Sequence, residues 1–343
     1  MREQTLTWKR REFLKSSLGT TVGFSAVGLG MADAREAGID PLQIPFGGGP
    51  IPHEWQSAAR IALWPGAAPD HVAHRVPRGA DWPATFLNGV VQPDLHLFRP
   101  QRSNGRAVLV IPGGAYTFVS IRNEGTDVAR VFTERGYTVF VLTYRLPGEG
   151  WARPYDVPLC DAQRAMRVIR SRAGIDGFDP ESTGVVGFSA GGHLAASLLT
   201  DHAQVLQPPV DSLDTLSARP RCGILIYPVI AVDGPLSHAL SAQRLLGAAP
   251  DAQVISRRSP ADHVDGTTPP VFMAHALDDP AVPWPNTMKF AEALGRQGKF
   301  PEMHLFGEGG HGFGIGPANG TAGQWPKLAM QWEERLAIVG KTA

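Results

Sequence analysis

Short apolar runs recur along the chain and alternate with segments whose apolar residues repeat at the period of a helix. Continuous apolar runs of four to eight residues are typical of strands buried on both faces of a sheet. Such runs lie at residues 107–111, 138–143, 223–227, 271–276 and 302–306, and a β-rich run at 183–186 joins them. Residues 94–99 alternate polar and apolar side chains instead, which predicts an edge strand.

Segments with a helical period lie between these runs. They cover residues 123–135, 161–172 and 325–338, with a shorter helix-like run at 192–199. Regular alternation of strands and helices predicts an α/β domain with a mostly parallel central sheet and helices on both faces. Residues 231–268 lack a clear period, so we expect an irregular insertion there that forms part of a pocket wall.

The first 34 residues differ in composition from the rest of the chain. Lys9, Arg10 and Arg11 precede a mildly apolar run, residues 18–31, which is too short and too polar for a stable membrane span. The paired arginines, followed by Ala-Asp-Ala at 32–34, match a twin-arginine signal and its cleavage site. We therefore expect residues 1–34 to be a signal peptide and the mature protein to be periplasmic or secreted. The alternative is the basic N-terminus of a cytoplasmic enzyme.

The remainder divides into two parts. Residues 35–93 are rich in Pro, Gly, Trp and His and lack a clear period, which predicts a lead-in segment packed on the main domain. Residues 94–343 carry the strands and helices, so we expect them to form the catalytic domain. The tryptophans of the lead-in, Trp55, Trp64 and Trp82, either line a sugar site or fill gaps in the core, and we favour the core.

Composition and charge narrow the classes of partner. The 343 residues, 43% of them hydrophobic, suffice for one large domain with a substantial core. Lys and Arg match Asp and Glu at 32 each, so the net charge is zero, and no basic tract follows the first residues. We therefore expect no nucleic-acid partner and, once the signal is removed, no membrane partner.

The two cysteines, Cys160 and Cys222, do not suggest a disulfide framework. A twin-arginine substrate crosses the membrane already folded, which favours two free, buried thiols over a disulfide between them. Neither C-x-x-C nor H-E-x-x-H occurs, so we expect no metal site.

The motif Gly-Phe-Ser-Ala-Gly at 187–191 carries the candidate nucleophile, Ser189. It follows the strand at 183–186 and precedes the helix-like run, which is the context of a nucleophile elbow. The two glycines remove Cβ atoms that would clash in so tight a turn. The alternative is a glycine-rich turn whose serine only caps the helix. His193 lies one turn further on, and we expect it to pack in the core rather than to act as the base.

A second glycine-rich turn, Pro-Gly-Gly-Ala-Tyr at 112–116, follows the first buried strand. Lipases and esterases carry a His-Gly-Gly-Gly-type oxyanion loop at this place in the fold. Glycine lets the backbone direct N–H groups toward a developing oxyanion. We therefore expect the N–H groups of Gly114, Ala115 and Ala190 to form the oxyanion hole.

The last two strands end in loops that carry the other two residue types of a triad. Leu-Asp-Asp-Pro-Ala-Val-Pro at 277–283 holds two candidate acids, Asp278 and Asp279. His311 lies in the glycine-rich loop at 307–314. The order Ser, Asp, His along the chain is that of α/β-hydrolases, so His311 is the expected base and one of the two aspartates the expected acid.

Five stretches together resemble a known family: residues 63–69, 112–116, 187–193, 275–283 and 310–313. With them the chain resembles bacterial α/β-hydrolase esterases of the acetylxylan-esterase-like kind, some of which carry the name xylanase B and which are related to feruloyl and pectin esterases. The resemblance covers most of the expected mature chain, and it implies an α/β-hydrolase fold.

The resemblance also implies roles for individual residues. Ser189 is the implied nucleophile and His311 the implied base. The family's acid stands three residues before a Val-Pro pair, which implies Asp279 rather than Asp278. The family usually has a third glycine where this chain has Ala115. The implied activity is a serine esterase that removes acetyl or similar acyl groups from a plant-type oligo- or polysaccharide, with neither a metal nor an organic cofactor.

Other functions share parts of this pattern or are suggested by the names of the related family. A serine peptidase or a lactone hydrolase would use the same triad. A glycoside hydrolase needs two carboxylates that flank the scissile bond, and the sequence singles out no such pair. A non-catalytic carbohydrate-binding protein on the same fold is the alternative from another class, and labelling of Ser189 by an organophosphonate would separate catalysis from binding.

Overall fold

An eight-stranded sheet forms the centre of the fold. The computed structural model describes residues 49–70, 82–315 and 320–339, all of them in one unit, Ile44–Ala343. The expected signal peptide, residues 1–34, lies outside the described residues, as does part of the expected lead-in. Within the described part of the chain, no helix is long and apolar enough to cross a membrane.

The strands follow the apolar runs closely. They are β1 Ala59–Ala62, β2 Phe86–Leu87, β3 Asp94–Phe98, β4 Ala107–Ile111, β5 Val119–Ser120, β6 Thr138–Thr143, β7 Thr183–Phe188, β8 Gly223–Ile226, β9 Val271–Ala276 and β10 Glu302–Phe306. Across the sheet the order is β1-β3-β6-β4-β7-β8-β9-β10, and β2 pairs separately with β5. The six strands from β6 to β10 run parallel, whereas β1 and β3 are antiparallel. The expected α/β class with a mostly parallel sheet is therefore confirmed.

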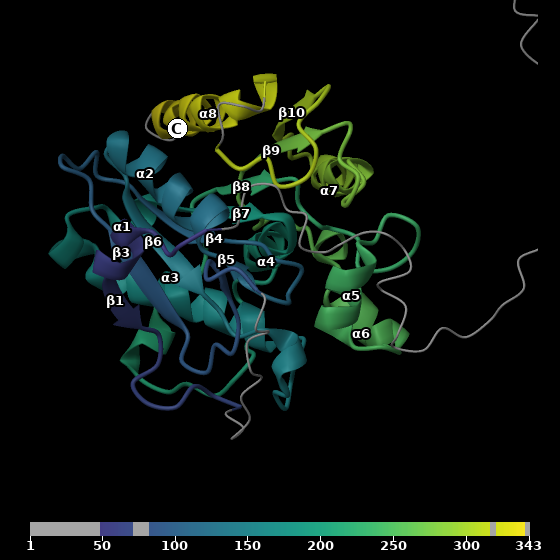
Figure 1. Ribbon diagram of the computed structural model, residues 1–343, viewed down its shortest axis with the longest axis horizontal. Coiled ribbons are helices and arrows are strands. Elements are labelled where there is room, and N and C mark those ends of the chain that lie inside the picture. The colour runs from purple at the N-terminus through teal and green to yellow at the C-terminus, as the bar shows by residue number, and fades with distance from the viewer. Residues whose placement is uncertain (1–48, 71–81, 316–319, 340–343) are drawn as a thin grey trace, which may run out of the picture. The chain divides into compact units, whose positions relative to one another are not determined.

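Helices cover both faces of this sheet. They are α1 His53–Ser57, α2 Asp127–Glu134, α3 Val157–Asp176, α4 Ser189–Thr200, α5 Ala239–Leu246, α6 Ala252–Arg257, α7 Pro285–Arg296 and α8 Trp325–Val339. On one face α3 packs against α4, and on the other α2 and α8 lie together (Figure 1). Because helices cover both faces, every residue of β4, β6 and β9 is buried, and these strands are continuous apolar runs in the sequence.

The expected edge strand, β3, is not at the edge. The lead-in segment supplies β1, which pairs antiparallel with β3 and forms the edge of the sheet. The polar residues that suggested exposure are buried and have partners: Asp94 accepts a hydrogen bond from Arg60 of β1, and His96 stacks on Trp55 at 3.7 Å between ring centroids. An alternating pattern predicts one wet face, and here residues of the lead-in cover that face.

The insertion at 231–268 is also more regular than expected, because it contains α5 and α6. Both helices are short, so neither displays enough turns for a period to stand out in the sequence. Asp251 begins α6 by accepting a hydrogen bond from the N–H of Val254 at 2.8 Å. Helix α7, which we did not predict, follows the candidate acid loop, and Pro285 stands in its first turn, where proline is tolerated.

Helix boundaries differ from expectation at two further places. Helix α3 begins at Val157, four residues before the predicted start, with Pro158 in its first turn. The predicted helix at 123–135 begins instead as a π-helical turn, Arg122–Thr126, before it becomes α2. Such turns are rare in proteins as a whole but frequent at functional sites, and Glu124 of this one accepts a hydrogen bond from Gly113, in the glycine-rich turn after β4.

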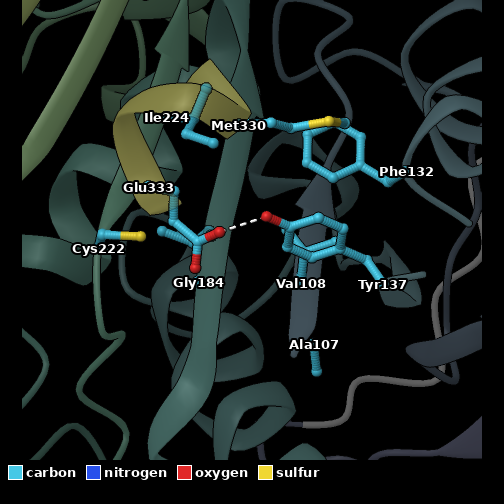
Figure 2. Close-up of a pocket in the computed structure, with 10 residues that line it drawn as sticks. Ala107, Val108, Phe132, Tyr137, Gly184, Cys222, Ile224, Met330 and Glu333 are labelled. Carbon is cyan, nitrogen blue, oxygen red and sulfur yellow. Dashed lines mark hydrogen bonds between the residues drawn. The ribbon is translucent and has the colours of Figure 1, made fainter. Parts of the chain in front are cut away.

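A small pocket lies at the amino ends of β4 and β7, beneath α8 (Figure 2). The Tyr137 hydroxyl points into it and donates a hydrogen bond to the carboxylate of Glu333 (Figure 2). Its volume, about 10 Å³, is room for at most one water molecule, so it is not a substrate site. Cys222 lines this pocket; both it and Cys160 are free and buried, and burial raises the pKa of the Cys160 thiol to about 12.

Candidate active site

Ser189 sits on a tight turn between β7 and α4. Its φ is 52°, in the left-handed region, so the turn is strained. A Cβ on Gly187 would lie 2.4 Å from the carbonyl oxygen of Gly191, and a Cβ on Gly191 would lie 2.3 Å from that of Ile111. Only glycine fits at either position. The helix-capping alternative does not describe this geometry, because Phe188 is the N-cap residue of α4 and no side chain caps the helix.

Three side chains from different strand ends meet at this turn. Ser189 Oγ lies 2.9 Å from Nε2 of His311, and Nδ1 of the same ring lies 2.7 Å from Oδ2 of Asp279. The Asp279 side chain is fully buried, whereas the His311 side chain is 17% exposed. Because Nδ1 faces a carboxylate, it carries the proton of the neutral ring, and Nε2 is left free to accept from the serine.

The Asp279 carboxylate is held by four donors. Oδ1 accepts from the N–H groups of Ala281 and Val282 at 2.9 and 2.8 Å, and Oδ2 accepts from His275 Nε2 at 3.2 Å as well as from His311. Burial alone would raise the pKa of Asp279, but the hydrogen bonds from the two histidines and from Val282 outweigh it and hold the pKa below the ordinary value. Asp279 is therefore ionised throughout the neutral range.

Asp278, the other candidate acid, points elsewhere. It is exposed, and its carboxylate accepts a hydrogen bond from the N–H of Gly310 at 2.8 Å. Successive side chains at a strand end point to opposite sides, so only one of the two aspartates reaches the ring of His311. The structure brings Asp279, not Asp278, against that histidine.

The glycine-rich loop after β4 lies directly beside Ser189. A Cβ on Gly113 would be 2.9 Å from the Cβ of Ser189 and 2.7 Å from the carbonyl oxygen of Phe188. Gly114 has a φ of 127°, which favours glycine, and Ala115 has a φ of 53°. The left-handed region costs an L-residue about 1–2 kcal/mol, so alanine is tolerated where the related family usually has glycine.

The N–H groups expected to form an oxyanion hole are free to do so. Within the described residues, the backbone N–H groups of Gly114, Ala115 and Ala190 donate no hydrogen bond. Ala190 is the second residue of α4, where N–H groups have no partner within the helix and the helix dipole favours negative charge. The three groups therefore remain the proposed oxyanion donors.

The ring of His193 hydrogen-bonds to groups other than Ser189. Its Nδ1 lies 2.8 Å from the hydroxyl of Tyr116, and its Nε2 donates to the carbonyl oxygen of Arg258 at 2.8 Å. Burial lowers the pKa of His193 to about 4, so the ring stays neutral at working pH. Tyr116 follows Ala115 in the oxyanion loop, so His193 fixes the far end of that loop rather than acting as a base.

Of the three lead-in tryptophans, two belong to the core. Trp55 and Trp64 are 5% and 3% exposed, and the indole N–H of Trp64 donates to Asp161 at 3.1 Å. Trp82 is half-buried and packs edge-on against Phe118, with 5.6 Å between ring centroids. The N–H of Phe118 donates to the carbonyl oxygen of Gly114 in the oxyanion loop at 3.1 Å, so Trp82 packs against a residue bonded to that loop.

Sequence reasoning missed a carboxylate behind the site. Glu124, in the π-helical turn, is 5% exposed; it accepts hydrogen bonds from the N–H of Gly113 at 2.7 Å and from the Tyr227 hydroxyl at 2.9 Å. The ring of Tyr227 packs edge-on against His311, with 5.0 Å between centroids. A signal for Glu124 was present, because it precedes Val128 by four residues and so falls on the apolar face of the predicted helix.

Comparison with known proteins places this site in a family. A family model described as BD-FAE matches residues 94–294, more than half of the chain. The chain belongs to the BD-FAE family. The matched segment includes Ser189 and Asp279 and ends before His311.

Two curated relatives have the names that the sequence resemblance suggested. The chain is 31% identical over 223 residues to an acetylxylan esterase of Xylanibacter ruminicola, a match that covers 64% of this chain and 43% of the relative. It is 37% identical over 209 residues to endo-1,4-beta-xylanase B of Butyrivibrio fibrisolvens, covering 61% of this chain and 32% of the relative. The chain thus spans less than half the length of either relative, and the resemblance is confirmed.

Solved structures agree on the fold. An acetyl ester-xyloside bifunctional hydrolase from Caldicellulosiruptor lactoaceticus is similar with a TM-score of 0.69 and 32% identity, over 82% of this chain and 97% of that one. Esterase 2 of Thermogutta terrifontis is similar with a TM-score of 0.59 and 27% identity, over 73% and 91% of the two chains. The α/β-hydrolase fold is therefore confirmed.

Proposed function

We propose that the protein is a serine carboxylic-ester hydrolase that removes acetyl or similar acyl groups from acylated plant-type carbohydrate. The observation that carries the proposal is the chain of contacts from Ser189 Oγ through the His311 ring to the buried Asp279 carboxylate. The names of the relatives support the ester class, and the acetylxylan esterase and the acetyl ester-xyloside hydrolase support an acetylated sugar as substrate.

The geometry supports an acyl-enzyme mechanism. Nε2 of His311 takes the proton of Ser189 Oγ as the oxygen attacks the ester carbonyl, and Asp279 stabilises the imidazolium that forms. The N–H groups of Gly114, Ala115 and Ala190 would stabilise the oxyanion of the tetrahedral intermediate. Collapse of the intermediate expels the sugar alcohol, which takes the proton from Nε2. In deacylation Nε2 of His311 takes a proton from water as the water oxygen attacks the acyl carbon, and Ser189 Oγ then leaves with that proton while the carboxylic acid is released.

The test compares ester classes and triad variants. The purified protein should hydrolyse p-nitrophenyl acetate and release acetate from acetylated xylan, with nitrophenyl xyloside, feruloyl esters, a lactone and a peptide anilide as competing classes. Ser189→Ala and His311→Ala should each lower kcat by about 10³-fold or more, without additivity when combined. Ser57→Ala and His53→Ala, exposed residues of α1, serve as matched controls. Retention of more than a tenth of wild-type turnover by either triad variant would contradict the proposal.

We also propose that residues 1–34 export the folded protein by the twin-arginine route to the periplasm or beyond. The support is the sequence alone: the Arg10 and Arg11 pair, the mildly apolar run and the cleavage-site pattern at 32–34. Replacing both arginines by lysine should leave an active, unprocessed protein in the cytoplasm. Unchanged export of that variant, followed by cell fractionation and mass determination, would refute the proposal.

A further inference from the structure

Glu124 lies behind the site in an unusual position for a carboxylate. It is buried, and its two oxygens accept from different parts of the fold: Oε2 from the N–H of Gly113 and Oε1 from the hydroxyl of Tyr227. Gly113 stands at the base of the oxyanion loop, where a Cβ would lie 2.9 Å from this same carboxylate. The carboxylate therefore fixes the loop at the residue that approaches Ser189 most closely.

The same π-helical turn also holds the histidine loop. The side-chain amide of Asn123 donates to the carbonyl oxygen of Gly312 at 3.0 Å. The N–H of Gly314 donates to the Tyr227 oxygen at 3.2 Å, so the tyrosine joins that loop to Glu124. Two adjacent residues of one turn thus connect the oxyanion loop to the loop that carries His311.

The hydrogen-bond pattern indicates that Glu124 is ionised. A backbone N–H can only donate, and Tyr227 accepts from Gly314, so its own proton is directed to Glu124. Burial is the largest influence and holds the pKa of Glu124 above its ordinary value, although hydrogen bonds from Gly113 and Tyr227 and the charge of His311 act in the opposite direction. Ionisation of Glu124 is therefore costly, and the hydrogen bonds from Gly113 and Tyr227 offset part of that cost.

We propose that Glu124 is a positioning residue for the ester hydrolysis proposed above: its carboxylate fixes the oxyanion loop at Gly113, and its charge, one tyrosine ring behind His311, favours the protonated imidazole that forms in the reaction. The inference rests on the proposed function. It assigns no contact with substrate to Glu124, which acts through Gly113, Tyr227 and His311.

Other groups that face His311 differ from Glu124 in charge, in exposure or in direct contact with the ring. Asp279 is the directly bonded carboxylate. Burial, with the nearby charge of His311, lowers the pKa of His238 to about 4, so that ring is neutral at working pH. Asp278 and Glu308, on the neighbouring loops, are exposed, and water screens their charge. A substitution of Glu124 therefore removes a buried negative charge behind His311 and leaves the three triad residues unchanged.

The main test is Glu124→Gln, which keeps the shape and removes the charge. Loss of a negative charge makes protonation of the histidine less favourable, so the acid limb of the kcat/KM profile should move to lower pH. We expect a shift of about 0.5 pH unit or more, since an opposite charge at about 4–6 Å moves a titration by 1–3 units and this carboxylate lies farther away. We expect kcat at pH 8 to fall about 10-fold, because the oxyanion loop loses a charged acceptor.

Two matched variants separate charge from packing. Glu333→Gln removes another buried carboxylate that accepts from a tyrosine, at the opposite ends of the strands (Figure 2). That pocket lies far from the site, because Gly184, which lines it, precedes Ser189 by five residues along β7, a separation of about 16 Å at the rise of a strand. The acid limb of Glu333→Gln should match that of the wild type. Asn123→Ala loosens the histidine loop without changing charge, so kcat should fall while the acid limb stays in place.

Thermal unfolding completes the test. Glutamine keeps one oxygen for the Gly113 N–H and turns its NH₂ group toward the Tyr227 hydroxyl, so a lost hydrogen bond opposes the gain from removing a buried charge. The Tm of Glu124→Gln at pH 8 should therefore stay within about 5 °C of the wild type. A Tm more than about 5 °C below wild type, which for a chain of this size corresponds to a sizeable loss of stability, would show a structural role and overturn the proposal. An acid limb that does not move in Glu124→Gln would also overturn it.

Failure of this inference and failure of the proposed function give different results. If the wild type hydrolyses p-nitrophenyl acetate and Ser189→Ala does not, the esterase assignment stands whatever Glu124→Gln shows. If the wild type is inactive on every ester class, the esterase assignment fails, and the role of Glu124 in ester hydrolysis fails with it.

Discussion

The Asp279 carboxylate decides which nitrogen of His311 carries the proton, and Asp279→Asn is therefore an informative single change. Its Oδ1 accepts from two backbone N–H groups, those of Ala281 and Val282. An asparagine must keep its oxygen there, because an NH₂ group would face two buried donors. The amide nitrogen then takes the place of Oδ2, 2.7 Å from Nδ1 of His311.

The consequence for catalysis follows from that orientation. Facing an NH₂ donor, Nδ1 of His311 becomes an acceptor, and the proton of the neutral ring moves to Nε2. Nε2 then points a hydrogen at Ser189 Oγ and cannot take the serine proton. A wrong tautomer of this kind lowers kcat by about 10⁴-fold, equivalent to about 5.4 kcal/mol at 1.36 kcal/mol for each factor of ten.

The assay is the initial rate of p-nitrophenyl acetate hydrolysis at pH 8, with Asp278→Asn as the matched control. Asp278 is exposed and accepts one hydrogen bond, from Gly310, so its replacement should change kcat by about 2-fold or less. The reasoning is refuted if Asp279→Asn keeps more than a tenth of wild-type kcat, or if the two variants exchange their effects.

Two further predictions concern stability. Gly191→Ala places a Cβ 2.3 Å from the carbonyl oxygen of Ile111, so the free energy of unfolding measured in urea should fall by about 1–3 kcal/mol. The control is Gly174→Ala, exposed on α3 with open space for a Cβ, which should raise the free energy of unfolding by about 1 kcal/mol. Equal effects of the two substitutions would contradict the account. Burial lowers the pKa of His193 from 6.5 to about 4, so the unfolded chain binds the extra proton between these values. Stability should be full above about pH 6.5 and fall by up to about 3 kcal/mol toward pH 4. His193→Gln should flatten that slope, and an unchanged slope would contradict the assignment.

Much of the sheet could be predicted because strands buried on both faces consist of continuous apolar runs, which are visible in the sequence. The bounds of β4, β6 and β9 match the apolar runs, because side chains on both faces of these strands are covered by helices. The bounds of β10 also match, although four of its five residues are only partly buried at the edge of the sheet. The loops that carry Ser189, Asp279 and His311 follow from those strands, because the carboxyl ends of parallel strands lie at the same edge of the sheet.

What could not be predicted depends on contacts between residues far apart in the chain. Pairing of β1 with β3 follows from partners for Asp94 and His96 that no local pattern identifies. The choice of Asp279 over Asp278 required the family resemblance, because the two neighbours have the same chemistry and differ only in direction. Glu124 lies on an apolar helix face, but its role depends on a contact with Gly113, eleven residues away on another element.

The central claim, that Ser189 is the nucleophile of an esterase, is tested most directly by reaction with an organophosphonate followed by peptide mass spectrometry. The account predicts one adduct per chain on the peptide that contains Ser189, loss of esterase activity in proportion to labelling, and no adduct on Ser189→Ala. An adduct on a different residue that accompanies inactivation, or full activity of a protein labelled at Ser189, would contradict it.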